Sequence, residues 1–266
     1  MLRAFDRPKE SIRWAREAVD EFQSGFRQFF EEQTRPPVLH PCYPYVRIID
    51  LEPETFDQIH KLRFCYALPR ALERKANEAL QNIRNSFDQS LFAACTAIHK
   101  VPRRGDLRFP WCTTPNDLAA RLNKRQIIPA EFHEIIRREE PYPTGDGYTG
   151  GNDTIRQIAH LANDKHTVGL KVLTHAAVAR PPSIMSLDPW VVVPEPSWNM
   201  VKNEIFLCKV SPRSKVHDNY QLSLQVAFDV SAPVGDMAAD TLLGEFADRA
   251  KRFAEVIEAR CTRLIQ

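Results

Sequence analysis

The chain has 266 residues, of which 43% are hydrophobic and 26% charged, and its formal net charge is +2 at pH 7. This composition is typical of a folded globular protein and excludes a wholly disordered chain. Because the charge is nearly balanced, no global electrostatic field by itself indicates nucleic acid or an anionic membrane, but a local basic patch is compatible with it.

The N-terminus leads into a charged amphipathic segment without the apolar core and small-residue cleavage site of a secretory signal. No uninterrupted apolar run approaches the roughly 20 residues that cross a bilayer. The sequence therefore predicts a cytoplasmic protein with no membrane partner.

Six cysteines are scattered along the chain, without a Cys-x-x-Cys pair or a cysteine and histidine spacing typical of zinc. They are Cys42, Cys65, Cys95, Cys112, Cys208 and Cys261. We expect each of them to be a small buried or half-buried side chain, and we expect no disulfide network, metal or cofactor.

An amphipathic helix is predicted over residues 9–30, where apolar side chains recur at steps of three and four. They are Ile12, Ala15, Val19, Phe22, Phe26, Phe29 and Phe30. This Phe-rich stripe is expected to pack on the chain's own core, and a homodimer or another protein partner is the alternative. Two prolines at 36 and 37 end the helix, so residues 1–36 are interpreted as an N-terminal helix.

Residues 37–266 are predicted to form a single α+β domain with a hairpin, a helical core, and a C-terminal sheet and helix. The β-branched and aromatic segments 45–51 and 58–66 predict the hairpin. The longest apolar stripe predicts a central helix over residues 70–99.

The region 101–148 is rich in proline, glycine and charge, and is expected to form loops that cover the central helix, with short helices at 114–122 and 129–136. A further helix is predicted from 152 to 162. Strands follow at 168–178, 189–193, 205–210 and 221–230, and a last helix covers 237–264. The expected fold is α+β, a long-helix bundle packed with a mostly antiparallel sheet formed mainly after residue 167.

Two polar clusters are the candidate functional residues. Arg84 and Asp88 lie four apart on the central helix, the spacing of an intrahelical ion pair. Asn163, Asp164 and His166 follow the helix predicted at 152–162 and would mark its end. If the clusters meet, they form one composite polar site.

Both clusters resemble motifs of an uncharacterised bacterial protein family. Residues 83–89, read as Ile-Arg-Asn-Ser-Phe-Asp-Gln, resemble that family's Leu-Arg-Ser-Ala-Leu-Asp-His helix. Residues 161–166, Leu-Ala-Asn-Asp-Lys-His, resemble its Leu-Asn-Asn-Ile-Asp-Lys-His segment. The resemblance extends more loosely through Phe109-Pro110 and residues 201–205, over roughly residues 40–266.

The Arg-x4-His pattern of that family helix is in turn similar to the signature of HEPN ribonucleases, helical proteins of bacterial defence and toxin systems that cut RNA without a metal. The resemblance implies that Arg84 would stabilise charge on a phosphorane. The position of the motif histidine is Gln89, so His166, oriented by Asp164, would have to supply the imidazole.

Three hypotheses follow. In the first, the chain is a HEPN-like component of a bacterial defence or stress system that binds RNA or a nucleotide at Arg84, Asp88, Asp164 and His166; if it is an enzyme, it is a metal-independent ribonuclease. In the second, it is a non-catalytic binding or assembly protein in which the same residues form a structural polar network. In the third, His166 is the general base of a small-molecule enzyme.

Basic and aromatic residues also mix around Arg103, Arg104, Arg108, Phe109 and Trp111, as they do on a surface that binds nucleic acid.

Overall fold

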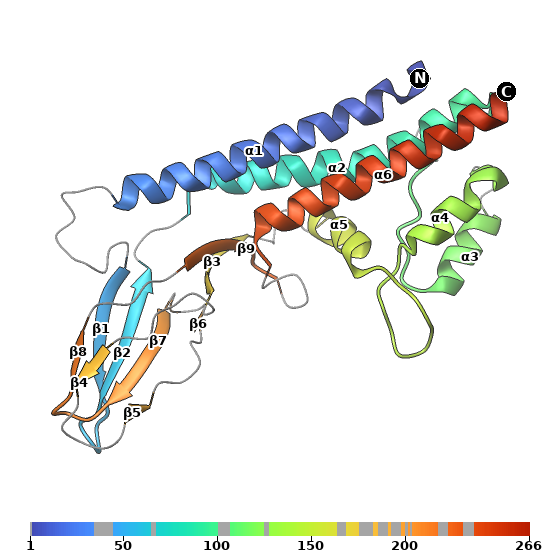
Figure 1. Cartoon of the computed structure of the whole chain (residues 1–266). Helices are drawn as coiled ribbons and strands as arrows, with labels where there is room; N and C mark the ends of the chain where they lie inside the picture. The colour runs from blue at the N-terminus through green and yellow to red at the C-terminus, as the bar shows by residue number, and fades with distance from the viewer. Residues whose placement is uncertain are drawn as a thin grey trace. The chain divides into compact units, whose positions relative to one another are not determined.

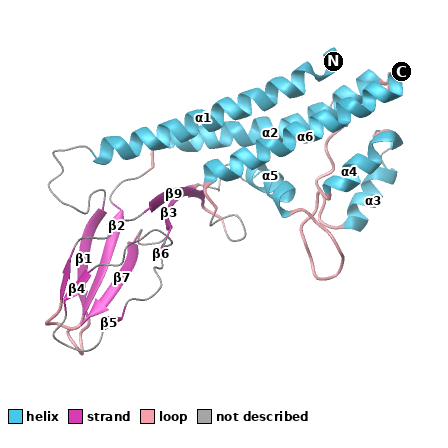
Figure 2. Ribbon diagram, viewed as in Figure 1, coloured by secondary structure: helices cyan, strands magenta, loops and turns pink. Residues whose placement is uncertain are grey.

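A computed structural model describes residues 2–34, 45–64, 68–100, 107–124, 128–163, 169–175, 183–185, 191–192, 198–199, 202, 204–217, 223–230 and 237–266. The chain is α+β, as predicted (Figure 2). It divides into two compact units, one formed by residues 1–23, 71–169 and 239–266 and the other by residues 24–70 and 170–238. The first helix contributes residues up to 23 to the first unit and its remaining residues to the second. The division expected at residue 37 stays a prediction.

Six α-helices form in the described residues (Figure 1): α1 (Asp6–Thr34), α2 (Arg70–Ala97), α3 (Pro115–Lys124), α4 (His133–Glu139), α5 (Asp153–Asn163) and α6 (Ala239–Ile265). All six were predicted. The first helix begins three residues earlier than expected, at Asp6, because Pro8 is tolerated in a first turn, where its missing N–H has no intrahelical partner. None of the described helices is long and apolar enough to cross a membrane.

Helices α1, α2 and α6 lie side by side in the first unit (Figure 1). Ser11 Oγ of α1 donates to Gln89 Oε1 of α2 at 2.8 Å. Lys9 Nζ of α1 lies 2.6 Å from Glu258 Oε2 of α6. Ring contacts join α2 to α6, so each of the three helices touches the other two.

The Phe-rich stripe of α1 is buried within the same chain. Five of its members are at most 9% exposed, Ile12, Ala15, Val19, Phe22 and Phe29, while Phe26 is half-buried. Internal packing, the first of the two alternatives, therefore holds for these side chains. A homodimer or protein partner that binds through the same stripe stays a prediction. Such a partner would have to displace side chains that already pack within the chain.

The strands that the structure describes in the second unit all pair antiparallel. They are β1 (Tyr45–Leu51), β2 (Gln58–Phe64), β3 (Leu170–His175), β4 (Ser183–Met185), β5 (Val191–Val192), β6 (Trp198–Asn199), β7 (Glu204–Val210), β8 (Lys215–His217) and β9 (Ser223–Phe228). The main sheet has the order β1-β2-β7-β5, with β6 also on β7, while β3-β9 and β4-β8 are separate pairs. The hairpin, which lies between α1 and α2 in the chain, thus belongs to the main sheet, so this sheet contains more residues from before position 167 than expected.

One face of the main sheet buries a histidine together with apolar side chains. His60 of β2 is 1% exposed, and Arg47 Nη2 lies 2.8 Å from its Nδ1. Because a guanidinium only donates, Nδ1 accepts, and the ring proton sits on Nε2, which donates to Gln58 Oε1 at 3.1 Å. His60 is therefore a neutral, fully partnered side chain and not a candidate ligand.

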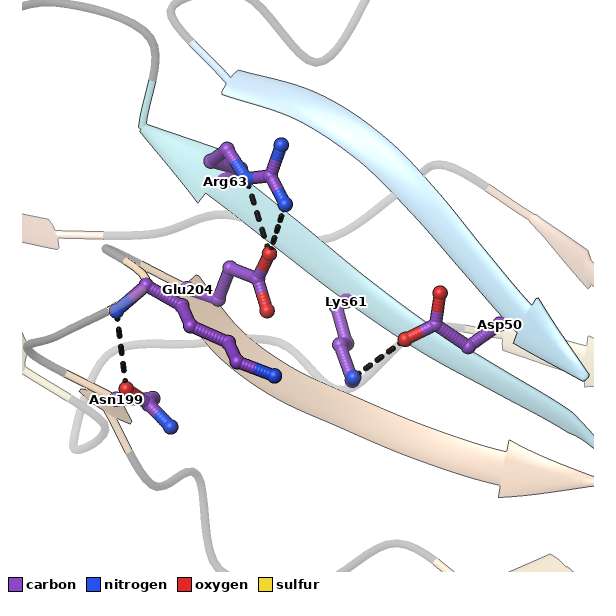
Figure 3. A network of polar contacts seen from close by, with 6 residues as sticks. Asp50, Lys61, Arg63, Asn199 and Glu204 are labelled. Atoms are coloured by element: carbon purple, nitrogen blue, oxygen red, sulfur yellow. Dashed lines mark hydrogen bonds and ion pairs between the residues drawn. The ribbon is translucent and has the colours of Figure 1, made fainter. Parts of the chain in front are cut away.

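Ion pairs cross the main sheet (Figure 3). Arg63 of β2 donates through Nε to Glu204 Oε1 of β7 at 2.9 Å, and through Nη2 to the same oxygen. Lys61 Nζ contacts Asp50 Oδ2 of β1 at 2.5 Å. Glu204, which lies in the segment 201–205 singled out by the family resemblance, therefore holds two strands together.

Candidate functional site

The polar side chains of the central helix α2 are hydrogen-bonded to three different segments. Gln81 Nε2 donates to the carbonyl of Ala162 in α5 at 2.7 Å. Gln89 accepts from α1, and Asp88 Oδ1 accepts the backbone N–H of Phe109 at 2.7 Å. The stretch 81–89 is thus a junction of the helical unit.

Asp88 is bound to a backbone amide instead of to Arg84. The two residues form no ion pair, so the intrahelical pair expected from their spacing is wrong. Burial raises the pKa of the Asp88 carboxyl above its usual value, against the opposing effects of the Phe109 N–H and of the positive charges of Arg84 and Arg108. The second oxygen, Oδ2, accepts no hydrogen bond from any described residue.

An aromatic cluster holds the segment 107–112 on α2. Phe87 of α2 lies 4.8 Å from Phe109 and 5.3 Å from Trp111 between ring centroids. Phe253 of α6 lies 5.0 Å from Phe87 and 5.1 Å from Phe109. This part of the loop region covers the central helix, as the sequence predicted, and carries Arg108 with it.

Three arginines around this segment have no ion-pair or hydrogen-bond partner among the described residues. Arg84 is half-buried, and its Nε is buried without an acceptor. Arg108 is exposed, next to Phe109. Burial raises the pKa of the Cys112 thiol to about 12, and the positive charges of Arg121 and of Arg156 in α5 act against this rise. We call Arg84, Arg108 and Arg156 the arginine cluster.

The comparisons with known proteins add no assignment. No family model, curated protein or solved structure matches the chain. The site is therefore interpreted from its own residues.

The second sequence cluster is described only at its beginning. Asn163 is the exposed last residue of α5, as the helix-terminus interpretation expects. Asp164 and His166 lie outside the described residues, so whether they meet Arg84 is a prediction. No group of three or more His, Cys, Asp or Glu side chains in the described ranges could hold a metal ion.

Gln89 and Arg156 change the composition of the candidate site. Gln89, at the position of the motif histidine, has its amide oxygen occupied by Ser11. Arg156 was not selected from the sequence, because an arginine beside the apolar stripe of α5 resembles any solvent-facing residue. The structure places Arg156 near the segment 107–112 through two contacts. Gln81 of α2 is hydrogen-bonded to α5, and Arg156 acts on Cys112 through its charge.

The described cysteines are expected to react slowly in the folded chain. Cys95, Cys112, Cys208 and Cys261 are buried as free thiols, as predicted. Burial raises the pKa of Cys95, Cys208 and Cys261 to about 11. Because the thiolate is the nucleophile, their alkylation by iodoacetamide at neutral pH should be ten-fold or more slower than in the unfolded chain. Peptide mass spectrometry after a short pulse measures this, and rapid native labelling of these four would contradict it.

Proposed function

We propose that the chain is a non-catalytic RNA-binding protein that uses the arginine cluster. The observation that carries the proposal is that Arg84, Arg108 and Arg156 have no partner among the described residues, while Arg108 lies in the aromatic segment 107–112, Arg84 acts by its charge on Asp88, which holds that segment, and Arg156 acts on Cys112. Several other arginines of the helical unit are engaged in ion pairs, as Arg121 is with Asp117.

Unpaired arginines suit phosphodiesters for a physical reason. A guanidinium presents several N–H donors in a planar fork that matches phosphate oxygens, and it is more weakly hydrated than an ammonium group. Binding a phosphate also releases condensed counterions, so each contact adds affinity that depends on salt. Three such groups on one unit would supply a short track for an RNA backbone.

Catalysis receives less support than binding. An amide cannot exchange protons near neutral pH, and Gln89 is also engaged with Ser11. Asp88 gives one carboxylate oxygen to the backbone of Phe109. The resemblance to HEPN proteins then supports the RNA ligand and the setting in defence or stress, without the cleavage step.

Substituting the arginine cluster is expected to weaken RNA binding and flatten its salt dependence. We expect each of Arg84→Gln, Arg108→Gln and Arg156→Gln to lower the affinity for a labelled oligouridylate several-fold and to reduce the slope of log K against log salt by about 0.7. Fluorescence anisotropy across a salt series measures both quantities. The same RNA, incubated in chelator and run on a denaturing gel, should stay intact.

A matched control is Arg138→Gln, because Arg138 is an exposed arginine already paired with Glu134 in α4. It removes the same charge from the chain but should change affinity less than the three cluster variants. Equal losses for all four variants would mean only non-specific attraction. Absence of RNA binding by the unmodified chain would refute the proposal.

A second candidate, the structural network, is favoured by the bond between Asp88 and the Phe109 N–H. In this alternative the stretch 81–89 ties α2 to α1, α5 and the segment 107–112, and the ligand is another protein. It predicts that Arg84→Gln leaves every RNA measurement unchanged.

A further inference from the structure

Asp88 has features that RNA binding by the arginine cluster does not explain. One oxygen of its carboxylate is fixed by the Phe109 N–H at 2.7 Å, and the other accepts nothing from the described residues. Arg84 and Arg108 act on it through their charge, yet neither closes an ion pair with it. A carboxylate that is held in place but left half-unpartnered between two unpaired cations is suited to interact with whatever those cations bind.

We propose that Asp88 couples phosphate binding at the arginine cluster to the uptake of one proton. This inference rests on the proposed function, and names the regulation of the same site.

The chemistry follows from the charges. A phosphodiester held by Arg84 and Arg108 would be repelled by an ionised Asp88 beside it. Protonation of Oδ2 removes that repulsion and turns the free oxygen into an O–H donor for a phosphate oxygen, while Oδ1 keeps the Phe109 N–H. The proton comes from solvent and no covalent bond to the ligand changes. Bound phosphate therefore favours protonated Asp88, and protonated Asp88 favours bound phosphate to the same extent.

The surroundings of Asp88 agree with this coupling. Burial already disfavours its charged form and raises the pKa of the carboxyl. The charged groups that act on it are Arg84 of α2 and Arg108 of the segment 107–112. Helix α1 approaches this turn through the neutral pair of Ser11 and Gln89, and α6 approaches it with aromatic contacts of Phe253. On α5, Arg156 lies near Cys112.

The sign of the effect is fixed by linkage. Binding that takes up a proton weakens as pH rises through the pKa of free Asp88 and strengthens as pH falls. The dissociation constant for RNA should therefore increase by up to about ten-fold per pH unit in that window, the limit for one proton. Asp88→Asn should bind like the protonated form at every pH, since its amide still offers Oδ1 to Phe109 and an N–H donor to phosphate.

The experiment measures the affinity of the full chain for a 5′-hydroxyl oligouridylate of about ten nucleotides. Uracil and phosphodiesters do not titrate between about pH 5 and 8, and the label is chosen so that it does not titrate either. Histidines of the protein titrate in this range in every variant. The informative result is therefore the difference between the unmodified chain and Asp88→Asn in the slope of the logarithm of the dissociation constant against pH. Thermal unfolding of each variant confirms that it is folded.

The matched control is Asp117→Asn. Asp117 is a carboxylate in the first turn of α3 whose pKa is lowered by its hydrogen bond with Arg121, so it stays ionised between about pH 5 and 8. Asp117→Asn removes one negative charge and should therefore raise the affinity for RNA slightly, without changing the slope of the logarithm of the dissociation constant against pH. Equal slopes for the unmodified chain and Asp88→Asn would overturn the inference while arginine-dependent binding kept the proposed function. Absence of binding at any pH would overturn both.

Discussion

Replacing Phe87 by alanine is expected to lower the free energy of unfolding by about 3–5 kcal/mol, the cost of removing a large aromatic side chain from a close-packed core. The ring is 0% exposed. It contacts Phe109, Trp111 and Phe253, so its loss would leave a cavity shared by α2, α6 and the segment 107–112. Aromatic pairs also contribute beyond the area they bury. Urea unfolding followed by circular dichroism gives the change in midpoint and slope.

Phe92→Ala is the matched control for this prediction. Phe92 lies in the same helix but is 37% exposed, so its truncation removes less buried surface and should cost about 1 kcal/mol or less. Similar losses for the two variants would show that the aromatic cluster does not form the core of the helical unit. Phe87→Ala should also weaken RNA binding, because it loosens the segment that carries Arg108.

The long elements could be predicted because their pattern is local. In α2, apolar side chains recur over 28 residues, and the buried set includes Leu72, Ala76, Leu80, Ile83 and Phe87 at helical spacing. Burial of one face alone explains such a pattern, so the helix and its inner face can be inferred without knowing the partner. The hairpin of β1 and β2 follows for the same reason, from two extended segments separated by a turn.

The partners of polar side chains could not be predicted, because each depends on segments far apart in the sequence. The spacing of Arg84 and Asp88 indicated an ion pair, but the carboxylate of Asp88 instead accepts a hydrogen bond from the backbone N–H of Phe109. A buried amide without an acceptor is costly, whereas an arginine on a helix flank can reach water with part of its guanidinium. The competition between the Phe109 N–H and the Arg84 guanidinium decides which contact Asp88 forms. The sequence does not show that Phe109 packs next to Asp88.

The pairing of the hairpin with β7 could not be predicted for the same reason, because it joins segments that are far apart in the sequence. β2 pairs with β7 across a gap of about 140 residues, with a register shift between His60 and Lys61. Periodicity marks each strand as extended but says nothing of which edge it joins. The ion pair of Arg63 and Glu204 is a consequence of that register and not a signal of it.

Replacing Arg63 by methionine is expected to lower the stability of the sheet unit by about 2 kcal/mol, within the range for leaving a buried charged group unpaired. The loss comes mainly from Glu204, whose carboxylate would be left without its partner while only 6% exposed, whereas Arg63 is 53% exposed. The exposure of the arginine keeps the loss below that of a fully buried pair. Replacing both residues by methionine should recover most of the loss, since the buried carboxylate of Glu204 is then absent.

Lys61→Met provides the comparison from the same strand. Lys61 pairs with Asp50, a carboxylate that is 50% exposed and stays hydrated when the lysine is removed, so its loss should cost no more than about 0.5 kcal/mol. A double-mutant cycle on Arg63 and Glu204, read by chemical denaturation, isolates the pair itself. If Arg63→Met cost no more than Lys61→Met, the burial of Glu204 would not set the strength of this contact, and the register of β2 on β7 would have to be held by the apolar face alone.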